Sequence, residues 1–324
     1  MSGGLTIHLE VGDGRVRPRL VRAAGPDAGR WIVGRTAAEA AAAIPLVFNL
    51  CGAAHRRAAE RALGLPVTPS SAAAREEAVR DHALAIGREW PVLLGGAPDP
   101  AVLAALGRRD PTTLAAALVG ADADLAGLTP RRLDLWLRRG GTATARLLAR
   151  ARAEIDPAWG RAGLPILTAA DAANALAADG PSPPRETTAL DRVAATPLLA
   201  VLLAAEGPSL FVRLLARLVD LLAWLAPAGG ARPAVAVPAG IGLAEAARGL
   251  LAHRARLVAG IVADYRVLSP TDWNLGADGV LARALARLPA SDATPRLARI
   301  VVSCINPCVP TTIAVVRAGA TADA

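Results

Sequence analysis

The spacing of apolar residues constrains the fold of this chain most, because it changes from a period of two to a helical period near residue 36. Leu5, Ile7 and Leu9 alternate with polar residues, and Gly12-Asp13-Gly14 supplies a turn before a second alternating run. A period of two is typical of a half-buried strand, and Pro18 restricts the second run to a sheet edge. The N-terminus is therefore predicted to form a β-hairpin.

The helical period from Thr36 onward predicts a mostly helical centre. Expected helices cover residues 51–63, 111–120, 131–137, 142–155, 169–178 and 188–225, with a loop at 179–184. Residues 227–230 break this region, and stretches rich in Val and Ile at 234–237 and 256–268 are expected to be short strands. A helix over 280–288, a turn at Asn306-Pro307 and a frayed tail beyond Ala318 are expected to follow.

These patterns predict an α+β fold with a mostly helical centre and small β portions near both ends. No internal repeat or clean linker divides the chain, so residues 1–324 are expected to form a single compact domain. Its parts are a β-hairpin region at 1–35, a helical region at 36–226, a β-rich region at 234–275, and a helix and C-terminal cysteine segment at 276–324.

Charge and hydropathy argue against a nucleic-acid partner and against a membrane span. All 36 basic residues are arginine and the formal net charge is +8, but the arginines are scattered in ones and twos. We therefore expect no nucleic-acid partner. The most apolar stretch, residues 211–225, carries Arg213, Arg217 and Asp220 on one stripe, which predicts a buried amphipathic helix. With no secretory signal pattern at the start, the protein is expected to be cytoplasmic.

Three cysteines and one histidine are the residues best suited to metal chemistry. Cys51 and His55 lie four residues apart on one predicted helix, while Cys304 and Cys308 lie near the other end of the chain. Three thiols and one imidazole would complete a tetrahedral zinc site, although neither pair has the tight spacing usual for structural zinc. The alternative is that these side chains only fill the core.

Five short motifs occur along the chain in an order that is typical of one enzyme family. They are Phe48-Asn49-Leu50-Cys51-Gly52-Ala53-Ala54-His55, Glu186-Thr187-Thr188-Ala189-Leu190-Asp191-Arg192, Glu245-Ala246-Ala247-Arg248-Gly249 with His253, Pro270-Thr271-Asp272-Trp273-Asn274, and Asn306-Pro307-Cys308. In this order they resemble the large subunit of nickel–iron hydrogenases, whose R-x-C-G-x-C-x-x-x-H and D-P-C-x-x-C motifs supply four metal-binding cysteines. The resemblance covers nearly the whole chain and implies a large-subunit-like fold.

The same resemblance implies that this chain has lost the nickel site. Cys51 matches a cysteine that bridges nickel and iron in the family, and Cys308 matches a terminal nickel ligand. The other two cysteine positions are Phe48 and Thr311, which offer no soft ligand. We therefore expect no nickel, no hydrogen turnover and no enzyme activity.

A large-subunit-like chain without a nickel site resembles the hydrogenase accessory proteins of the HupK/HoxV kind. The resemblance implies a maturation scaffold or chaperone that transiently holds the Fe(CN)2CO unit. Cys51 and Cys308 would bind the iron, and His55 and Cys304 are further candidate ligands. Expected partners are the maturation complex that makes the iron unit and the hydrogenase large-subunit precursor. A metal-free structural relative of the large subunit and a small zinc or redox protein remain alternatives.

Other site residues are assigned by the same resemblance. Arg248 matches the family arginine beside the diatomic ligands of the iron, and Thr271 matches a residue that offers a hydroxyl to a second cyanide. A guanidinium can donate to a cyanide nitrogen in a dry pocket. Glu245, His253 and Glu186 are expected to support the site.

Cys51 and Cys308 are expected to lie within disulfide or shared-metal range, since both match ligands of one site. Cys51 begins a predicted helix, and the helix N-terminus together with Arg248 is expected to favour its thiolate form. Cys304 is expected to have neither influence.

Overall fold

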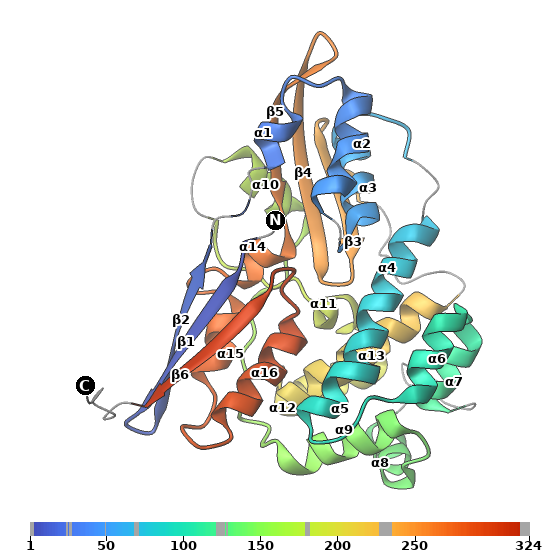
Figure 1. Cartoon of the computed structure of the whole chain (residues 1–324), viewed down its shortest axis with the longest axis vertical. Helices are drawn as coiled ribbons and strands as arrows, with labels where there is room; N and C mark the ends of the chain where they lie inside the picture. Colours follow the sequence, from blue (N-terminus) through green and yellow to red (C-terminus); the bar gives the residue numbers. More distant parts are fainter. Residues whose placement is uncertain are drawn as a thin grey trace.

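The computed structural model describes residues 3–23, 25, 28–48, 50–67, 71–120, 127, 129–178, 182–226 and 235–317. The molecule is elongated, with one sheet at the top and a helical body with a second sheet below (Figure 1). The prediction of an α+β fold with a helical centre is confirmed.

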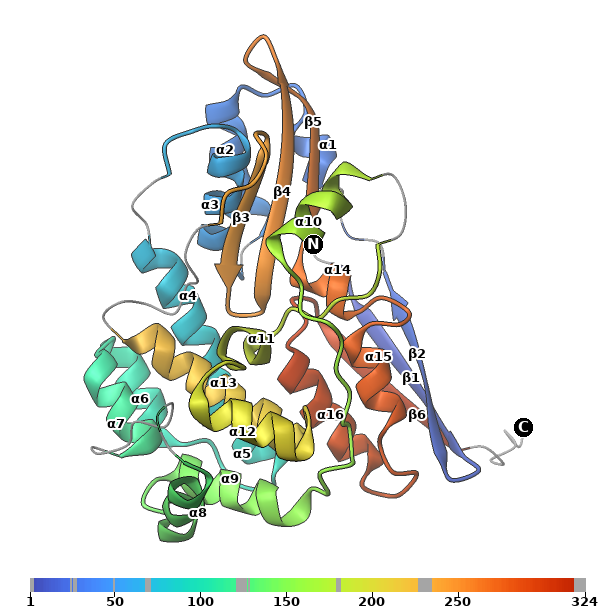
Figure 2. The same cartoon turned by 180° about the vertical axis from the view of Figure 1, so that it is seen from behind.

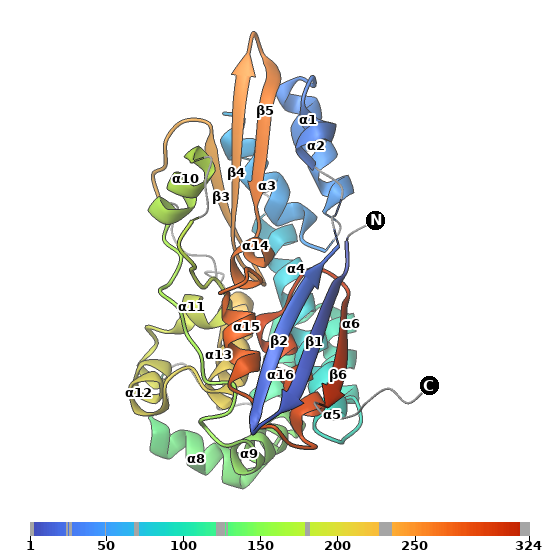
Figure 3. The ribbon, with the colours of Figure 1, turned by 90° about the vertical axis from the view of Figure 1, so that its left-hand side faces the viewer.

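The two ends of the chain form one three-stranded sheet. Its strands are β1 (Leu5–Gly12), β2 (Arg15–Arg22) and β6 (Thr311–Arg317). β1 and β2 make the predicted antiparallel hairpin, and β6 pairs parallel with β1 on its other side, so that β2 is an edge strand (Figure 3). Leu5, Ile7 and Leu9 are buried, as their alternation predicted. The sheet therefore joins the C-terminal segment to the N-terminus.

Helices fill most of the chain between this hairpin and residue 226. They are α1 (Ala28–Ile32), α2 (Ala37–Val47), α3 (Gly52–Ala62), α4 (Ser71–Leu84), the π-helical turn η1 (Ala85–Glu89), α5 (Trp90–Leu93), α6 (Pro100–Arg108), α7 (Pro111–Val119), α8 (Pro130–Arg139), α9 (Ala143–Glu154), α10 (Ala169–Ala177), α11 (Ala189–Val193), α12 (Pro197–Glu206) and α13 (Leu210–Leu225). Asp110 caps α7 by accepting from the backbone of Thr112 and Thr113, and Gly120 ends that helix. The expected helices are confirmed within a few residues at each end.

The amphipathic helix that the sequence indicated is α13, which lies in the middle of the helical body (Figure 1). Its polar stripe faces inward, because Arg213, Arg217 and Asp220 are each at most 2% exposed. Each of these side chains therefore needs a buried partner of opposite charge or a hydrogen bond. In the part of the chain that the structure describes, no helix has the length and apolarity to cross a membrane.

A second antiparallel sheet follows, and the last helices come after it. These elements are β3 (Ile241–Ala246), β4 (Gly249–Val258), β5 (Ile261–Leu268), α14 (Pro270–Asn274), α15 (Val280–Ala286) and α16 (Thr294–Ile305). The sheet is covered by α1 to α3 on one face and by α10 on the other (Figure 2). Its two covered faces explain why β3 and the first half of β4, which are rich in Gly and Ala, show no alternation in the sequence.

Some expectations differ from the structure. Residues 235–237 do not form the expected strand. The turn at Asn306 is confirmed, since this residue ends α16 with a φ of 58°. Residues 179–181, 227–230 and 234 and the tail beyond residue 317 lie outside the described residues, as does Asn49.

Gly242 allows β3 to lie against the backbone of α3. A Cβ at this position would lie 1.9 Å from the carbonyl oxygen of Ala58 and 2.6 Å from the backbone nitrogen of Ala62. Since both contacts are with backbone atoms, no side-chain rotation can relieve them. The Gly240-Ile241-Gly242 segment thus serves close packing.

Gly242→Ala is expected to lower the free energy of unfolding by about 2–3 kcal/mol, because α3 and β3 must separate. Gly107→Ala is the matched control, since a Cβ added there in α6 meets nothing within 4 Å. This control should be neutral or stabilising by about 1 kcal/mol or less. Urea unfolding measures both variants, and equal destabilisation of the two would contradict the close approach.

Candidate functional site

Cys51 lies at the N-cap position of α3, as the sequence predicted, and is 7% exposed. Its side chain makes no capping hydrogen bond. Instead, the carboxylate of Glu77 on α4 accepts from the backbone N–H groups of Ala53 and Ala54, at 2.9 and 3.4 Å. Glu77 therefore accepts from the backbone N–H groups that would otherwise lack a partner at the start of α3. The thiol of Cys51 is left free for another partner.

Cys308 comes from the opposite end of the chain and lies against Thr271. Its Sγ is 2.9 Å from Thr271 Oγ1, and its backbone N–H donates to the same hydroxyl oxygen over 3.2 Å. Thr271 belongs to α14 and is 2% exposed. The structure thus brings together the cysteine and the threonine that the resemblance assigned to one site.

Cys51 and Cys308 are close enough to interact electrostatically, and both are free thiols. Burial, together with the smaller effect of Cys308, raises the pKa of Cys51 to about 12, although Arg248 opposes this rise. The expected stabilisation of a Cys51 thiolate is therefore wrong, because desolvation outweighs both the helix end and the arginine. The neutral thiol is the stable form until a cation takes the place of its proton.

Arg248 lies in the turn between β3 and β4, where Asp81 of α4 fixes its orientation. Its Nη2 donates to Asp81 Oδ1 over 2.6 Å, and the guanidinium is buried. The other carboxylate oxygen of Asp81 accepts from Asn306 Nδ2 at 2.6 Å and from Arg217 Nη2 at 3.1 Å. Although burial disfavours its charge, Arg217 and Arg248 hold the pKa of Asp81 below its usual value.

Asp81 therefore joins α4, α13, the β3–β4 turn and the segment that leads to Cys308. Asp81 lies outside the five motifs of the sequence and was not predicted to belong to the site. The nearby Nε of Arg248 has no hydrogen-bond partner among the residues that the structure describes. This N–H remains available as a donor on a residue that acts electrostatically on the Cys51 thiol.

Glu186 and Glu245 stabilise the surrounding structure through ion pairs. Arg213 donates to both carboxylate oxygens of Glu186, at 2.6 and 3.1 Å. Glu245 lies 3.4 Å from Arg192, which also forms a bidentate pair with Asp220 on α13. Both acidic residues thus fix the arginines of the interior.

The segments that carry the motifs are also joined directly by Asn274 and Thr187. Asn274 Oδ1 accepts from the backbone of Thr187, and its Nδ2 donates to the carbonyl of the same residue. Thr187 Oγ1 in turn accepts from the backbone N–H of Leu250 at 2.7 Å. Gly249, with a φ of 131°, passes so close that an added Cβ would lie 2.5 Å from the Thr187 carbonyl oxygen.

Comparison with known proteins supports the resemblance seen in the sequence. No family model matches the chain. It is 36% identical to the hydrogenase expression/formation protein HupK of Rhodobacter capsulatus, over 97% of this chain and 98% of the relative. It is 31% identical to HupK of Azotobacter vinelandii, over 98% of this chain and all of the relative. The chain belongs to the HupK family of hydrogenase expression/formation proteins.

Solved structures confirm the fold of this HupK family member. It superposes on the Ni-Fe-Se hydrogenase from Desulfovibrio vulgaris Hildenborough with a TM-score of 0.59 and 15% identity, covering 91% of this chain and 94% of that one. An NAD+-reducing [NiFe]-hydrogenase gives a TM-score of 0.54 and 19% identity, with 91% and 93% coverage. At such low identity these structures show the fold, which is that of hydrogenase large subunits.

Phe48 and Thr311 are the two residues that the motif resemblance matches to cysteine positions. Phe48 stacks on His55 with ring centroids 3.7 Å apart and an angle of 8° between the planes. Thr311 begins β6 and donates its hydroxyl to the carbonyl of Val309. Phe48 thus packs against a ring, and Thr311 bonds to the backbone of its own segment.

His55 and His253 form a buried chain that ends at Tyr265. His55 Nδ1 lies 2.9 Å from His253 Nε2, and His253 Nδ1 lies 2.7 Å from the Tyr265 hydroxyl. Burial lowers the pKa of His253 to about 3 and that of His55 well below its usual value, and His253 lowers the latter further. Both imidazoles are therefore neutral, with His55 Nε2 unpartnered among the described residues.

Cys304 does not join the other cysteines in a zinc site. Within the described ranges, no three or more His, Cys, Asp or Glu side chains are grouped so as to hold a metal ion. Cys304 is buried on α16, where burial raises its pKa to about 12, and Arg213 and Arg217 partly oppose the rise. Cys304 lies near the C-terminal end of α16 and not at a helix N-terminus, and the cations that act on its thiol are Arg213 and Arg217.

Proposed function

We propose that this chain is a scaffold for hydrogenase formation that holds the Fe(CN)2CO unit and does not turn over hydrogen. The single observation that carries the proposal is that two free thiols from opposite ends of the chain, Cys51 and Cys308, lie near enough to act electrostatically on one another. Arg248 also acts on Cys51, and Thr271 contacts Cys308. The names of its relatives, which are expression/formation proteins, support a role in formation rather than catalysis.

The donor set fits an iron that already carries strong-field ligands. Such a unit needs only one or two protein thiolates, and Cys51 and Cys308 can supply two once their protons leave. Because the neutral thiol of Cys51 is favoured in the free protein, iron binding and proton release should be coupled. The guanidinium of Arg248 supplies N–H donors for an anionic cyanide nitrogen, and the hydroxyl of Thr271 supplies another.

A resident nickel ion does not fit these residues. Nickel in the hydrogenases requires four thiolates, whereas Phe48 and Thr311 stand at two of the corresponding positions. We propose that the maturation complex that makes the iron unit is the donor partner and that the hydrogenase large-subunit precursor is the acceptor.

Infrared spectroscopy tests this proposal directly. Protein purified without oxygen from cells that make the iron unit should show cyanide and carbonyl bands together with iron. Cys51→Ala and Cys308→Ala should each fold but lose these bands and fail to support hydrogenase formation, because each removes a ligand.

Cys304→Ala is the matched control, because it removes an equally buried thiol of the same raised pKa that lies outside the site. This variant should keep the infrared bands and should still support hydrogenase formation. Zinc in place of iron, metal-free wild-type protein, or a Cys51→Ala variant that matures hydrogenase normally would contradict the iron scaffold.

A further inference from the structure

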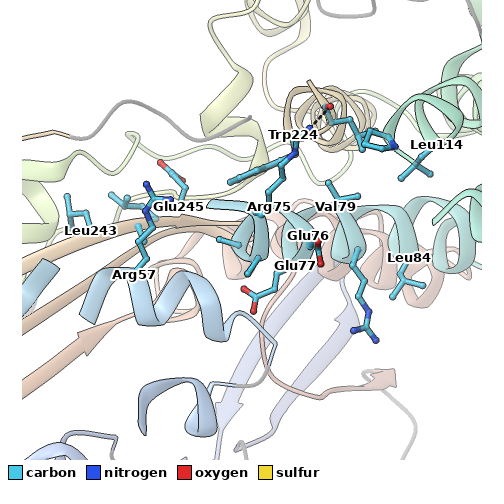
Figure 4. A pocket seen from close by; sticks show the side chains of 18 of the residues that line it. Arg57, Arg75, Glu76, Glu77, Val79, Leu84, Leu114, Trp224, Leu243 and Glu245 are labelled. Carbon is cyan, nitrogen blue, oxygen red and sulfur yellow. Dashed lines mark hydrogen bonds between the residues drawn. The ribbon is translucent and has the colours of Figure 1, made fainter. Parts of the chain in front are cut away.

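A groove of about 1600 Å³ runs along α4, on the side of the molecule where α3, β3 and the C-terminal end of α13 meet it (Figure 4). It is separate from the buried residues that bind Asp81, but it approaches the thiol site. Glu77 lines the groove and also caps the helix that begins at Cys51. Ala74 lines the groove and packs in the same small cluster as Cys51.

The acidic side chains of this groove are already engaged. Glu77 accepts from the start of α3, Asp110 caps α7, and Glu245 contacts Arg192. Glu76 lies 4.0 Å from Arg109. The carboxylates at this surface therefore have partners within the protein itself.

The arginines of the groove are mostly without a counter-charge. The side chains of Arg57, Arg80 and Arg88 form no ion pair or hydrogen bond with any residue that the structure describes. Arg61 and Arg75 also line the groove, and each donates to a backbone carbonyl, which carries no charge to neutralise them. The groove consequently presents an excess of positive charge.

Trp224 provides a buried donor in the same groove. It is 3% exposed, and its indole Nε1–H has no acceptor among the described residues. Trp can only donate through this atom, so a ligand must bring an oxygen acceptor to satisfy it. Leu243 and Leu250 add apolar lining nearby, which can accept an apolar side chain.

We propose that this groove binds an acidic segment of a partner protein, with an apolar residue anchored beside Trp224 and carboxylates facing Arg57, Arg80 and Arg88. Among the described residues of the groove, the side chains left without a partner that the argument uses, Trp224 and the three arginines, are donors or cations, which matches a ligand made of acceptors and negative charge. A second copy of this chain fits poorly, because its net charge is +8. A single-stranded nucleic acid typically stacks its bases on exposed aromatic rings, whereas Trp224 is buried.

A selection experiment tests the proposal independently of iron. A phage-displayed library of random peptides is selected against the wild-type protein, and the enriched peptides are then measured by fluorescence anisotropy. We expect acidic peptides with one large apolar residue. Their affinity should fall roughly tenfold or more in the triple variant Arg57→Glu, Arg80→Glu and Arg88→Glu, and should weaken with added salt.

The matched control is the triple variant Arg131→Glu, Arg132→Glu and Arg138→Glu, which makes the same charge change on exposed positions of α8 outside the groove. This variant should bind the peptides nearly as well as wild type. Trp224→Phe keeps an aromatic ring but removes the N–H donor, and it should weaken binding several-fold while thermal unfolding stays nearly unchanged.

Three results would overturn the proposal. One is the enrichment of neutral or basic peptides, and another is equal loss of affinity in both triple variants. The third is tighter, groove-dependent binding of a single-stranded oligonucleotide than of the selected peptides. Because none of these measurements needs the iron unit, failure here leaves the scaffold proposal intact, and failure of the infrared test leaves the groove proposal intact.

Discussion

Replacing Asp220 with alanine is expected to lower the free energy of unfolding by about 3–5 kcal/mol. Asp220 is fully buried on α13, accepts from Arg192 at 2.9 and 2.5 Å, and lies 2.9 Å from His82 Nε2. Without this carboxylate, the guanidinium of Arg192 would remain charged in an interior where its side chain is 1% exposed. Urea unfolding at neutral pH measures the loss.

Asp292→Ala is the control for this experiment, since its ion pair with Arg317 lies on the surface. Water screens that pair, so its removal should cost less than about 1 kcal/mol. Asp220→Asn tests the charge separately, because it keeps the size of the side chain. A loss below 1 kcal/mol for both Asp220 variants would show that the arginine finds another partner or that the site is wet.

The helical centre could be predicted from the sequence because its signals are local. Asp110 and Gly120 mark the two ends of α7 within the sequence itself, and the structure uses both. β6 could not be found in this way, since its partner β1 lies about three hundred residues away along the chain. The covered faces of β3 remove the alternation that would have revealed it.

The candidate site was predictable only in part, for a similar reason. The motif resemblance placed Cys308 and Thr271 together, and the structure shows their contact. Asp81 was missed because its importance comes from Arg217, Arg248 and Asn306, which three distant segments supply. The protonation of Cys51 was mispredicted because a helix end can be seen in a sequence, whereas the depth of burial that outweighs it cannot.

Acid is expected to destabilise the protein already from about pH 6.5 downward, because three histidines are buried in the neutral form. Burial lowers the pKa of His253 to about 3, and it also lowers the pKa values of His55 and His82. In the unfolded chain each imidazole titrates near its ordinary value of 6.5. Between these values the unfolded state binds more protons than the folded state, so stability is complete above pH 6.5 and is lost as the pH falls.

The expected loss is large. Each histidine that stays neutral in the folded protein lowers the free energy of unfolding by about 1.4 kcal/mol for each pH unit below 6.5. For His253 alone, this loss amounts to about 5 kcal/mol by pH 3. Protonation of Asp220 should lower the stability further at still lower pH, since Arg192 and His82 hold its pKa at about 2 despite burial. Its contribution is present above the ordinary aspartate pKa near 3.8 and disappears as the pH falls toward 2.

Urea unfolding of metal-free protein between pH 8 and pH 4 separates these stages. His253→Gln should reduce the slope of stability against pH between 6.5 and 4 by about 1.4 kcal/mol per unit, whatever its effect at neutral pH. A wild-type stability that stays constant from pH 7 to pH 5 would mean that His55 and His253 gain protons without unfolding, and hence that water reaches them. The stacked Phe48 and the covered sheet argue against such access, since both keep solvent from the His55–His253 pair.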